Sequence, residues 1–265
     1  MKKYFMCAMA AVAMLSVSSC SSEEEVNMSG AKGVGYISLN TSTEDAVITR
    51  AAADITTFKA KVYTGGVEGT YVWGTKDTYA SIDASINTTP MSPTNYVVDV
   101  RNYDNMDAAL ADNSKYGAAY WEGQANVTVV TATKTSVTVA CGKPKNTKLI
   151  LNAPAFDGTA LSLKISAPRD LDFVWDNSTK VFDHAESFFV PAAQLSYTIS
   201  YTINGIEKVT STKTLTMGAA GTAKKLTIAS NANGTITLSI TTEDFDEATE
   251  ETLTFDAATG EEVKK

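Results

Sequence analysis

His184 is the only histidine, so most hydrolytic or zinc chemistry in this chain would depend on it. It lies in Phe182-Asp183-His184-Ala185-Glu186, between acidic residues, and no Gly-x-Ser-x-Gly motif accompanies it. A Ser-His-Asp triad would need this side chain, and neither a multi-histidine zinc site nor an HExxH helix can be built from one histidine. We therefore expect a loop or strand-end histidine and a protein that is not an enzyme.

The acidic residues form two groups that could bind a hard cation. They are Asp104, Asp107 and Asp112, and Asp170, Asp172 and Asp176 around Trp175. Neither group has the twelve-residue spacing of an EF-hand, although calcium at either one stays an alternative. With 30 acidic residues some close pair is inevitable, so their number does not indicate a glycosidase. We expect solvated turn carboxylates, with no metal and no cofactor.

The aromatic residues allow a second kind of site, a platform on which sugar rings stack. The candidates are Trp73, Trp121 and Trp175, with Tyr116 and Tyr120. In a strand-rich protein alternating aromatic side chains more often fill the core, and we favour that role. No phosphate-binding glycine loop is present.

The first twenty residues predict export. Lys2 and Lys3 precede an apolar run of about 14 residues, Tyr4–Val17, which is shorter than the roughly 20 needed to span a bilayer. Small residues then lead to Cys20, and Leu15–Cys20 resembles the bacterial lipobox, in which a cysteine receives a diacylglyceryl group. We predict cleavage between Ser19 and Cys20 and a lipid on Cys20. A plain secreted protein is the alternative.

The acidic tether that follows, residues 20–32, begins with Ser21-Ser22-Glu23-Glu24-Glu25. In Bacteroidetes lipoproteins such a tract resembles a signal for display on the cell surface, and a solvated tether has the same composition. We expect an outer-membrane, lipid-anchored protein facing the cell surface. Its partners would then be the membrane, through the lipid, and other surface proteins or glycans.

Composition narrows the function further. Removing 19 of 265 residues leaves 246 with 20 basic and 30 acidic residues, a formal charge of about −10. An acidic chain without a basic cluster or zinc-finger spacing is a poor partner for nucleic acid. If Cys20 is acylated, Cys141 has no intramolecular partner. Its run, Val137-Thr138-Val139-Ala140-Cys141, indicates a small buried hydrophobe.

Threonine alternating with Val, Ile and Leu predicts half-buried strands and an all-β fold. We expect strands over 33–40, 58–63, 70–76, 81–87, 95–103, 147–153, 161–167, 173–176 and 187–190. We also expect hairpins of 124–131 with 135–141, of 195–203 with 206–210 through Asn204-Gly205, and of 224–229 with 235–241 through Asn233-Gly234. A short helical or irregular crossover is expected within 104–119. The segment 251–256 is either a late edge strand or part of a tail.

The spacing of these strands predicts two tandem β-sandwich domains. After a signal peptide (1–19) and a tether (20–32), we expect an N-terminal sandwich over 33–142 and a C-terminal one over 146–241. The boundary between them is the proline-containing segment 142–146, and an acidic segment, 242–265, follows.

The chain resembles a known family of Bacteroidetes lipoproteins, that of the domain of unknown function 4493. Besides the lipobox, the strand 33–40 and Thr49-Arg50-Ala51, the resemblance depends on the following stretches. They are Asn95–Val100, Tyr116–Gly123, Val127–Val129, Thr135–Cys141 and Asn146–Leu151. By architecture such proteins are similar to fimbrillins, the pilus subunits and anchors built from two transthyretin-like, Greek-key sandwiches. The resemblance implies surface display and a role in adhesion or assembly, and it implies no ligand.

The same resemblance suggests a role for Arg50. Fimbrillin precursors are cut after an arginine in the loop that follows the first strand, and this frees a groove for a neighbouring subunit's strand. Arg50 follows the first predicted strand here, although an arginine in a loop is also common by chance. We expect a non-catalytic, fimbrillin-like protein of adhesion or surface assembly, with proteolytic processing at Arg50 as a subsidiary hypothesis. The alternative is a carbohydrate-binding lipoprotein of a glycan-uptake system.

Overall fold

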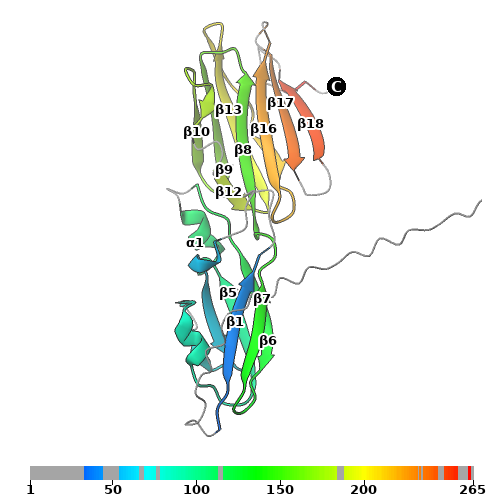
Figure 1. Cartoon of the computed structure of the whole chain (residues 1–265). Coiled ribbons are helices and arrows are strands. Elements are labelled where there is room, and N and C mark those ends of the chain that lie inside the picture. The colour runs from blue at the N-terminus through cyan, green and yellow to red at the C-terminus, as the bar shows by residue number, and fades with distance from the viewer. Residues whose placement is uncertain are drawn as a thin grey trace, which may run out of the picture. The chain divides into compact units, whose positions relative to one another are not determined.

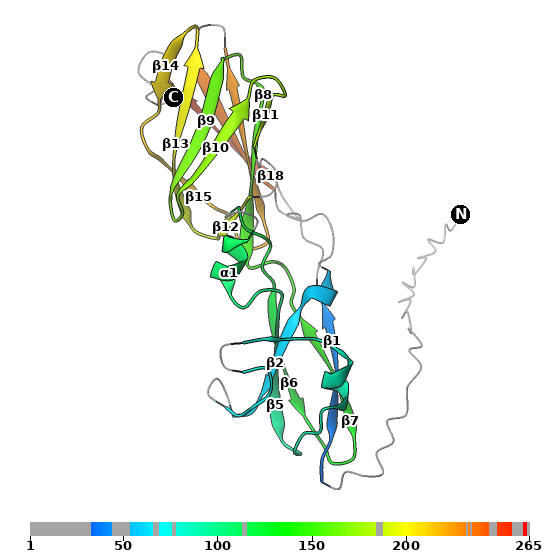
Figure 2. The same ribbon diagram turned by 90° about the vertical axis from the view of Figure 1, so that its left-hand side faces the viewer.

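The computed structural model describes residues 33–43, 54–65, 69–75, 78–112, 116–183, 188–231, 233, 235–243, 248–255 and 262–263. Strands dominate these residues, as Figures 1 and 2 show, which confirms the all-β prediction. Among the described helices none is long and apolar enough to pass through a membrane. The predicted lipidation, cleavage and processing residues lie outside the described part.

The first half of the chain contains β1 (Tyr36–Ser42), η1 (Ile55–Thr57), β2 (Lys59–Tyr63), β3 (Tyr71–Trp73), β4 (Ala80–Ser81), η2 (Ala84–Thr88), β5 (Asn95–Arg101), α1 (Met106–Ala111), β6 (Glu122–Thr128) and β7 (Lys134–Ala140). The second half contains β8 (Asn146–Ala155), β9 (Ala160–Ala167), β10 (Leu171–Asp176), β11 (Val181–Phe182), β12 (Phe188–Pro191), β13 (Gln194–Ile203), β14 (Ile206–Val209), β15 (Lys213–Thr216), β16 (Ala223–Ser230), β17 (Ile236–Glu243) and β18 (Ala248–Phe255).

Two sheets enclose the first core. One has the order β3-β2-β5-β6, with β4 also paired to β2, and the other consists of β1 and β7 in parallel. Side chains of one face of β5, such as Val98 and Val100, are fully buried in this core together with Phe58 and Ile37. Because successive residues of a strand face opposite sides, Asp99 and Arg101 must then lie on the outer face.

The predicted hairpin of 124–131 with 135–141 is wrong. β6 pairs with β5 and β7 pairs with β1, so the two strands lie in different sheets. Val127 and Val139 both point into the same core, because the two strands face each other across it. The connection bends at Ala132, whose backbone has φ +56° and whose N–H donates to the carbonyl of Val34 at 2.7 Å. Alternation of apolar residues is the same in both arrangements, so the sequence could not separate them.

The strand predicted over 81–87 is also mostly wrong, because η2 replaces it after the two residues of β4. Asp83 caps η2 by accepting a hydrogen bond from the backbone N–H of Ser85 at 2.8 Å. The side-chain carbonyl of Asn87 then accepts from the N–H of Leu39 at 3.2 Å. A polar side chain therefore covers part of the edge of β1.

The second half of the chain forms a sandwich of two further sheets. Their orders are β11-β10-β9-β13-β14, with β15 also on β13, and β12-β8-β16-β17-β18. The hairpin at Asn204-Gly205 is confirmed: both residues have positive φ, +54° and +73°, as the two-residue turn requires. β16 and β17 also pair as predicted. The residues next to Asn233, where we placed that turn, lie outside the described part.

The C-terminal sheet continues past residue 241. β17 extends to Glu243, and β18 pairs with it along eight residues, so the segment around 251–256 is an edge strand rather than a tail. Beyond it, the N–H of Val263 donates to the carbonyl of Thr254 at 2.8 Å. The carboxylate of Glu262 pairs with Lys213 of β15 at 3.1 Å, which links this segment to the opposite sheet.

The helical crossover is confirmed as α1, which begins where the side chain of Asn105 accepts from the N–H of Ala108 at 2.8 Å. Two hydrophobic clusters thus exist, one for each pair of sheets. Ala31–Lys265 nevertheless forms one compact unit. The first cluster also includes Phe189 and Ala223 from the second half of the chain. The division into two domains stays a prediction.

Candidate functional site

Charged side chains gather on the outer face of the sheet formed by β2, β5 and β6. In the register of this sheet Asp99 stands between Lys61 and Gln124, and Arg101 lies next to Glu122. Alternation produces this arrangement, because each of these residues neighbours a core residue in its own strand. Cross-strand neighbours on one face lie close enough for direct pairing.

Asp99 is the centre of this group, although it is only 4 % exposed. Its carboxylate accepts hydrogen bonds from Tyr79 Oη at 2.9 Å and from Gln124 Nε2 at 3.1 Å. Arg101 donates two more, from Nε at 3.2 Å and Nη2 at 3.1 Å, in the two-pronged geometry that suits a carboxylate. A buried charge is tolerated when it is paired and fully hydrogen-bonded, and Asp99 meets that condition.

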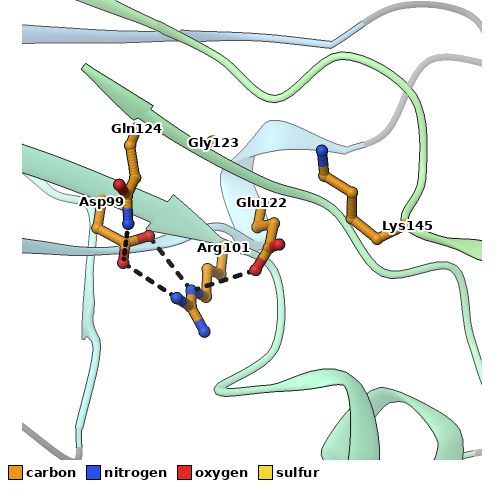
Figure 3. A pocket seen from close by; sticks show the side chains of 6 residues that line it. All are labelled: Asp99, Arg101, Glu122, Gly123, Gln124 and Lys145. Carbon is orange, nitrogen blue, oxygen red and sulfur yellow. Dashed lines mark hydrogen bonds and ion pairs between the residues drawn. The ribbon is translucent and has the colours of Figure 1, made fainter.

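A pocket of about 320 Å³ opens beside this network, as Figure 3 shows. Its lining consists of Asp99, Arg101, Glu122, Gly123, Gln124 and Lys145. The Glu122 carboxylate lies 3.8 Å from Arg101 Nε and accepts a hydrogen bond from Tyr120 Oη at 2.8 Å. The exposed side chain of Lys145 reaches the pocket from the segment that precedes β8.

The network also fixes the protonation of two of its members. Burial opposes the charge of Arg101, but the hydrogen bonds and the charge of Asp99 outweigh it, so the pKa of Arg101 is raised. Burial, together with the negative charge of Asp99, raises the pKa of Tyr79 well above its usual range. Arg101 is therefore a permanent cation, and Tyr79 is a neutral donor.

Tyr79 covers part of the network from the segment before β4. Its ring lies between two cations: Lys61 Nζ is 4.1 Å and the Arg101 guanidinium carbon is 4.8 Å from the ring centroid. Such cation–π contacts contribute about 0.5–1 kcal/mol each, and more where water is excluded. The Tyr79 ring therefore contacts one face of the Arg101 guanidinium, while Asp99 accepts hydrogen bonds from its nitrogen atoms.

The position of Lys145 depends on the extended segment 118–121. The backbone N–H of Lys145 donates to the carbonyl of Tyr120 at 2.7 Å. Asn146 next to it is fully buried, and its side chain donates to the carbonyl of Ala118 at 2.7 Å and accepts from the N–H of Tyr120 at 3.0 Å. Asn102 holds the other edge in the same way, bonding Ala119 O at 2.7 Å and Trp121 N at 2.9 Å.

The groups that line this site are suited to binding. The residues that line it include no histidine, cysteine or serine nucleophile. Within the described ranges no three or more His, Cys, Asp and Glu side chains gather in a way that could hold a metal ion. What the pocket offers is hydrogen-bond donors and acceptors in fixed positions.

The two acidic groups singled out in the sequence are not part of the pocket. In the first, Asp104 lies 3.6 Å from Lys59, and Asp112 accepts a hydrogen bond from Tyr103. In the second, Asp170 lies 3.3 Å from Lys164. Asp176 accepts from the N–H of Ser178 at 2.7 Å, as a turn carboxylate does. In neither acidic group do the described carboxylates come together as a possible metal site.

The aromatic residues mostly fill the cores, as predicted. Trp121 is 5 % and Trp175 is 4 % exposed, and each belongs to a hydrophobic cluster. Tyr120 is also buried, while Tyr116 packs against Phe173 with ring centroids 5.5 Å apart. The alternative, a sugar-stacking platform, is therefore not formed by these four residues.

Cys141 is a buried hydrophobe, as predicted, with 2 % exposure. Burial, assisted by the negative charge of Asp99, raises the pKa of its thiol to about 11. A thiol held neutral in this way is a poor nucleophile at neutral pH. Ser19, Cys20, Arg50 and His184 lie outside the described residues, so their predicted roles stay predictions.

Most of the pocket residues were not among the candidates predicted from the sequence: Asp99, Arg101, Gln124 and Lys145. One signal could have shown two of them. In Asn95–Arg101 the alternate residues Asp99 and Arg101 interrupt an otherwise apolar strand, and a charge in such a strand calls for a partner. The contribution of Lys145 had no local signal, because its segment meets the sheet only through the fold.

Comparison with known proteins agrees with the resemblance drawn from the sequence. Residues 33–257 match the family described as Domain of unknown function (DUF4493). A comparison with curated protein sequences gives no match.

Among solved structures, a proposed cell adhesion protein from Bacteroides ovatus is similar over 80 % of this chain and 96 % of its own, with 10 % identity and a TM-score of 0.42. A second proposed cell adhesion protein, from Bacteroides thetaiotaomicron, is similar over 74 % of this chain and 93 % of its own, with 12 % identity and a TM-score of 0.34. The Bacillus anthracis TIE protein covers 86 % of this chain and 49 % of its own at 11 % identity, with a TM-score of 0.29.

Proposed function

The chain belongs to the DUF4493 family, and from that premise we propose that it is a lipid-anchored, non-catalytic protein of the cell surface that acts in adhesion or surface assembly. The lipobox-like run that ends at Cys20 and the acidic tract after it support the anchor and its outward display. Two acyl chains are enough for stable anchoring, because each buried methylene contributes about 0.8 kcal/mol. The all-β fold suits an exposed structural protein, although many functions share such folds.

One observation carries the assembly part of the proposal, namely the way in which β1 is attached. Within the described residues β1 has a single strand partner, β7, and it inserts Ile37 (0 % exposed) and Leu39 (8 %) into the first core. Arg50 follows β1 in the sequence. Cleavage there would leave β1 held by noncovalent contacts alone. Its release would expose the edge of β7 and an apolar groove that another strand could fill.

Mass spectrometry of the protein from its native membrane, before and after protease shaving of intact cells, tests this proposal. We expect an acylated peptide that begins at Cys20 and the loss of downstream peptides on shaving. A new N-terminus at Ala51, absent from an Arg50→Ala variant, would establish processing and strand release. An unmodified N-terminus elsewhere would disprove lipid anchoring. Intact chains that keep β1 in surface assemblies would disprove strand release but not display.

A second candidate is glycan binding, and the outer-face pocket favours it. The described part presents no row of exposed aromatic side chains that would support glycan binding, because its exposed large apolar residues are all aliphatic. If this protein binds sugar, it does so mainly through hydrogen bonds. The pocket is the part of the fold that could supply them.

A further inference from the structure

We propose that the pocket beside Asp99 binds a single residue of an uncharged saccharide. This inference deepens the glycan-binding candidate and is independent of lipid anchoring and of strand release. It depends on the charge balance of the lining, on the hydrogen-bonding groups that remain available, and on the rigidity of the groups that present them.

The charges of the lining cancel. Asp99 and Glu122 are negative, Arg101 and Lys145 are positive, and the other lining residues, Gly123 and Gln124, are neutral. Anions are attracted to sites with excess positive charge, and cations to sites with excess negative charge. A pocket with two charges of each sign favours neither. An uncharged ligand that can address both signs at short range suits it best.

The groups that remain available include both acceptors and a donor. The carboxylate of Asp99 is already engaged by Tyr79, Arg101 and Gln124, whereas Glu122 accepts from Tyr120 through Oε2. Among the described residues no hydrogen bond reaches Oε1 of Glu122, Oε1 of Gln124 or Nζ of Lys145. Figure 3 shows Gln124, Glu122 and Lys145 in this order from left to right. They offer an acceptor, a second acceptor and a donor.

A hydroxyl group is the natural partner of such a set, because it donates one hydrogen bond and accepts two. One hydroxyl can accept from Lys145 while it donates to Glu122, and its neighbour on the same ring can donate to Gln124. A carboxylate ligand would use Lys145 but would face the oxygens of Glu122 and Gln124. An ammonium ligand would meet the opposite conflict at Lys145.

The donors and acceptors are held in place before any ligand arrives. Gln124 and Arg101 are fixed by Asp99, Glu122 by Tyr120, and the backbone of Lys145 by the carbonyl of Tyr120. Binding then orders few side chains beyond the stem of Lys145, and each ordered side chain would cost about 0.5–1.5 kcal/mol. A volume of about 320 Å³ is at the small end of ligand pockets, which suits one sugar ring.

The pocket offers no exposed aromatic ring for a sugar to stack on, and this predicts a weak affinity. Tyr79 (7 % exposed) and Tyr120 (3 %) are buried, so neither ring offers a face on which a sugar could stack. Hydrogen bonds in a wet pocket give small net gains, because they replace bonds to water. We expect a dissociation constant on the order of 1 mM for a monosaccharide. Display of many copies on a surface would raise the avidity for a repeating glycan.

Saturation-transfer NMR on the full mature chain in detergent micelles tests the proposal. The probes are the neutral sugars glucose, galactose, mannose, fucose and N-acetylglucosamine, with glucuronate and glucosamine as charged counterparts. The double variant Glu122→Gln, Lys145→Met removes both charges. The glutamine keeps a side-chain oxygen that can still accept the hydrogen bond from Tyr120. The matched control is Glu207→Gln, Lys208→Met on β14, which makes the same changes away from the pocket.

We expect at least one neutral sugar to bind, at least about tenfold weaker binding by the double variant, and no change in the control. Thermal denaturation must show that both variants are folded, and the single variant Lys145→Met, at an exposed position, serves if the double one is not. Absence of binding by all the neutral sugars at concentrations well above 1 mM would overturn the proposal. So would stronger binding of glucuronate or glucosamine, or undiminished binding by the folded double variant.

Discussion

Asp99 shows how one residue can organise a surface. It is placed on the outer face by the alternation of β5, and it is buried because Tyr79, Arg101 and Gln124 close around it. All three partners bond to this one carboxylate, which therefore helps to fix their positions. The residue therefore contributes to stability and to the shape of the pocket at once.

Replacing Asp99 by Ala should destabilise the protein by about 2 kcal/mol. Removing one partner of a buried ion pair costs roughly 3–5 kcal/mol, because the other charge is left unpaired. The side chain of Arg101 is 22 % exposed, so water will recover part of that cost. Urea denaturation measures the change, with Asp157→Ala, an exposed carboxylate, as the control. A loss no larger than that of the control would show that the network adds no stability.

Cys141 predicts a pH dependence at the same scale. The folded protein keeps the thiol neutral up to a pKa of about 11, against an ordinary value of 9.0. A raised pKa means that the folded state binds the proton more tightly, so this contribution is complete below pH 9 and is lost as the pH rises towards 11. The stability advantage of the wild type over Cys141→Ala should therefore shrink between pH 9 and 11 in urea titrations. A gap that is constant over this range would contradict the assignment.

At the scale of elements, the close approach of β6 to the end of β7 determines how the first sandwich closes. A Cβ atom on Gly123 would lie 2.5 Å from the carbonyl oxygen of Ala140 and 3.0 Å from Cα of Cys141. Both are backbone atoms, which cannot rotate away. A glycine is therefore required here by contact across the core, and its φ is not positive.

Gly123→Ala should cost about 3 kcal/mol, because overpacking against backbone forces the two strands apart. Gly205→Ala is the matched comparison. Nothing lies within 4 Å of its added Cβ, so only the positive φ of +73° opposes the change, and we expect about 1 kcal/mol. Urea midpoints of both variants measure the difference. Equal losses would mean that the strands can relax around Gly123.

At the scale of the whole molecule, the segment 116–121 links the two hydrophobic clusters. Tyr116 packs against the second cluster, and Trp121 is buried in the first. Asn102 and Asn146 hold the backbone between them from both sides. The aromatic stretch that stood out in the sequence thus has a structural role, and its Gly117 lies close to Phe189 and Leu110.

Asn146→Ala should destabilise the protein by about 3 kcal/mol. It leaves the carbonyl of Ala118 and the N–H of Tyr120 without their buried partner, and each such loss costs about 1–3 kcal/mol. Thermal denaturation gives the size of the effect, and limited proteolysis should show faster cleavage within 116–121. Asn126→Ala, at an exposed position of β6, is the control. Unchanged proteolysis of 116–121 would show that other contacts hold this segment.

The all-β class, most strand positions, the Asn204-Gly205 hairpin and the family could all be predicted from the sequence. Each of these depends on neighbours in the chain, through the two-residue period of a strand or the φ angles of a turn. Three features became visible only in the folded structure: β6 and β7 face each other across a core, η2 replaces a strand, and Lys145 joins Asp99 at one pocket. The physical reason is that alternation fixes which side chains face inward but not which strands become partners. That choice depends on packing between segments distant in the chain.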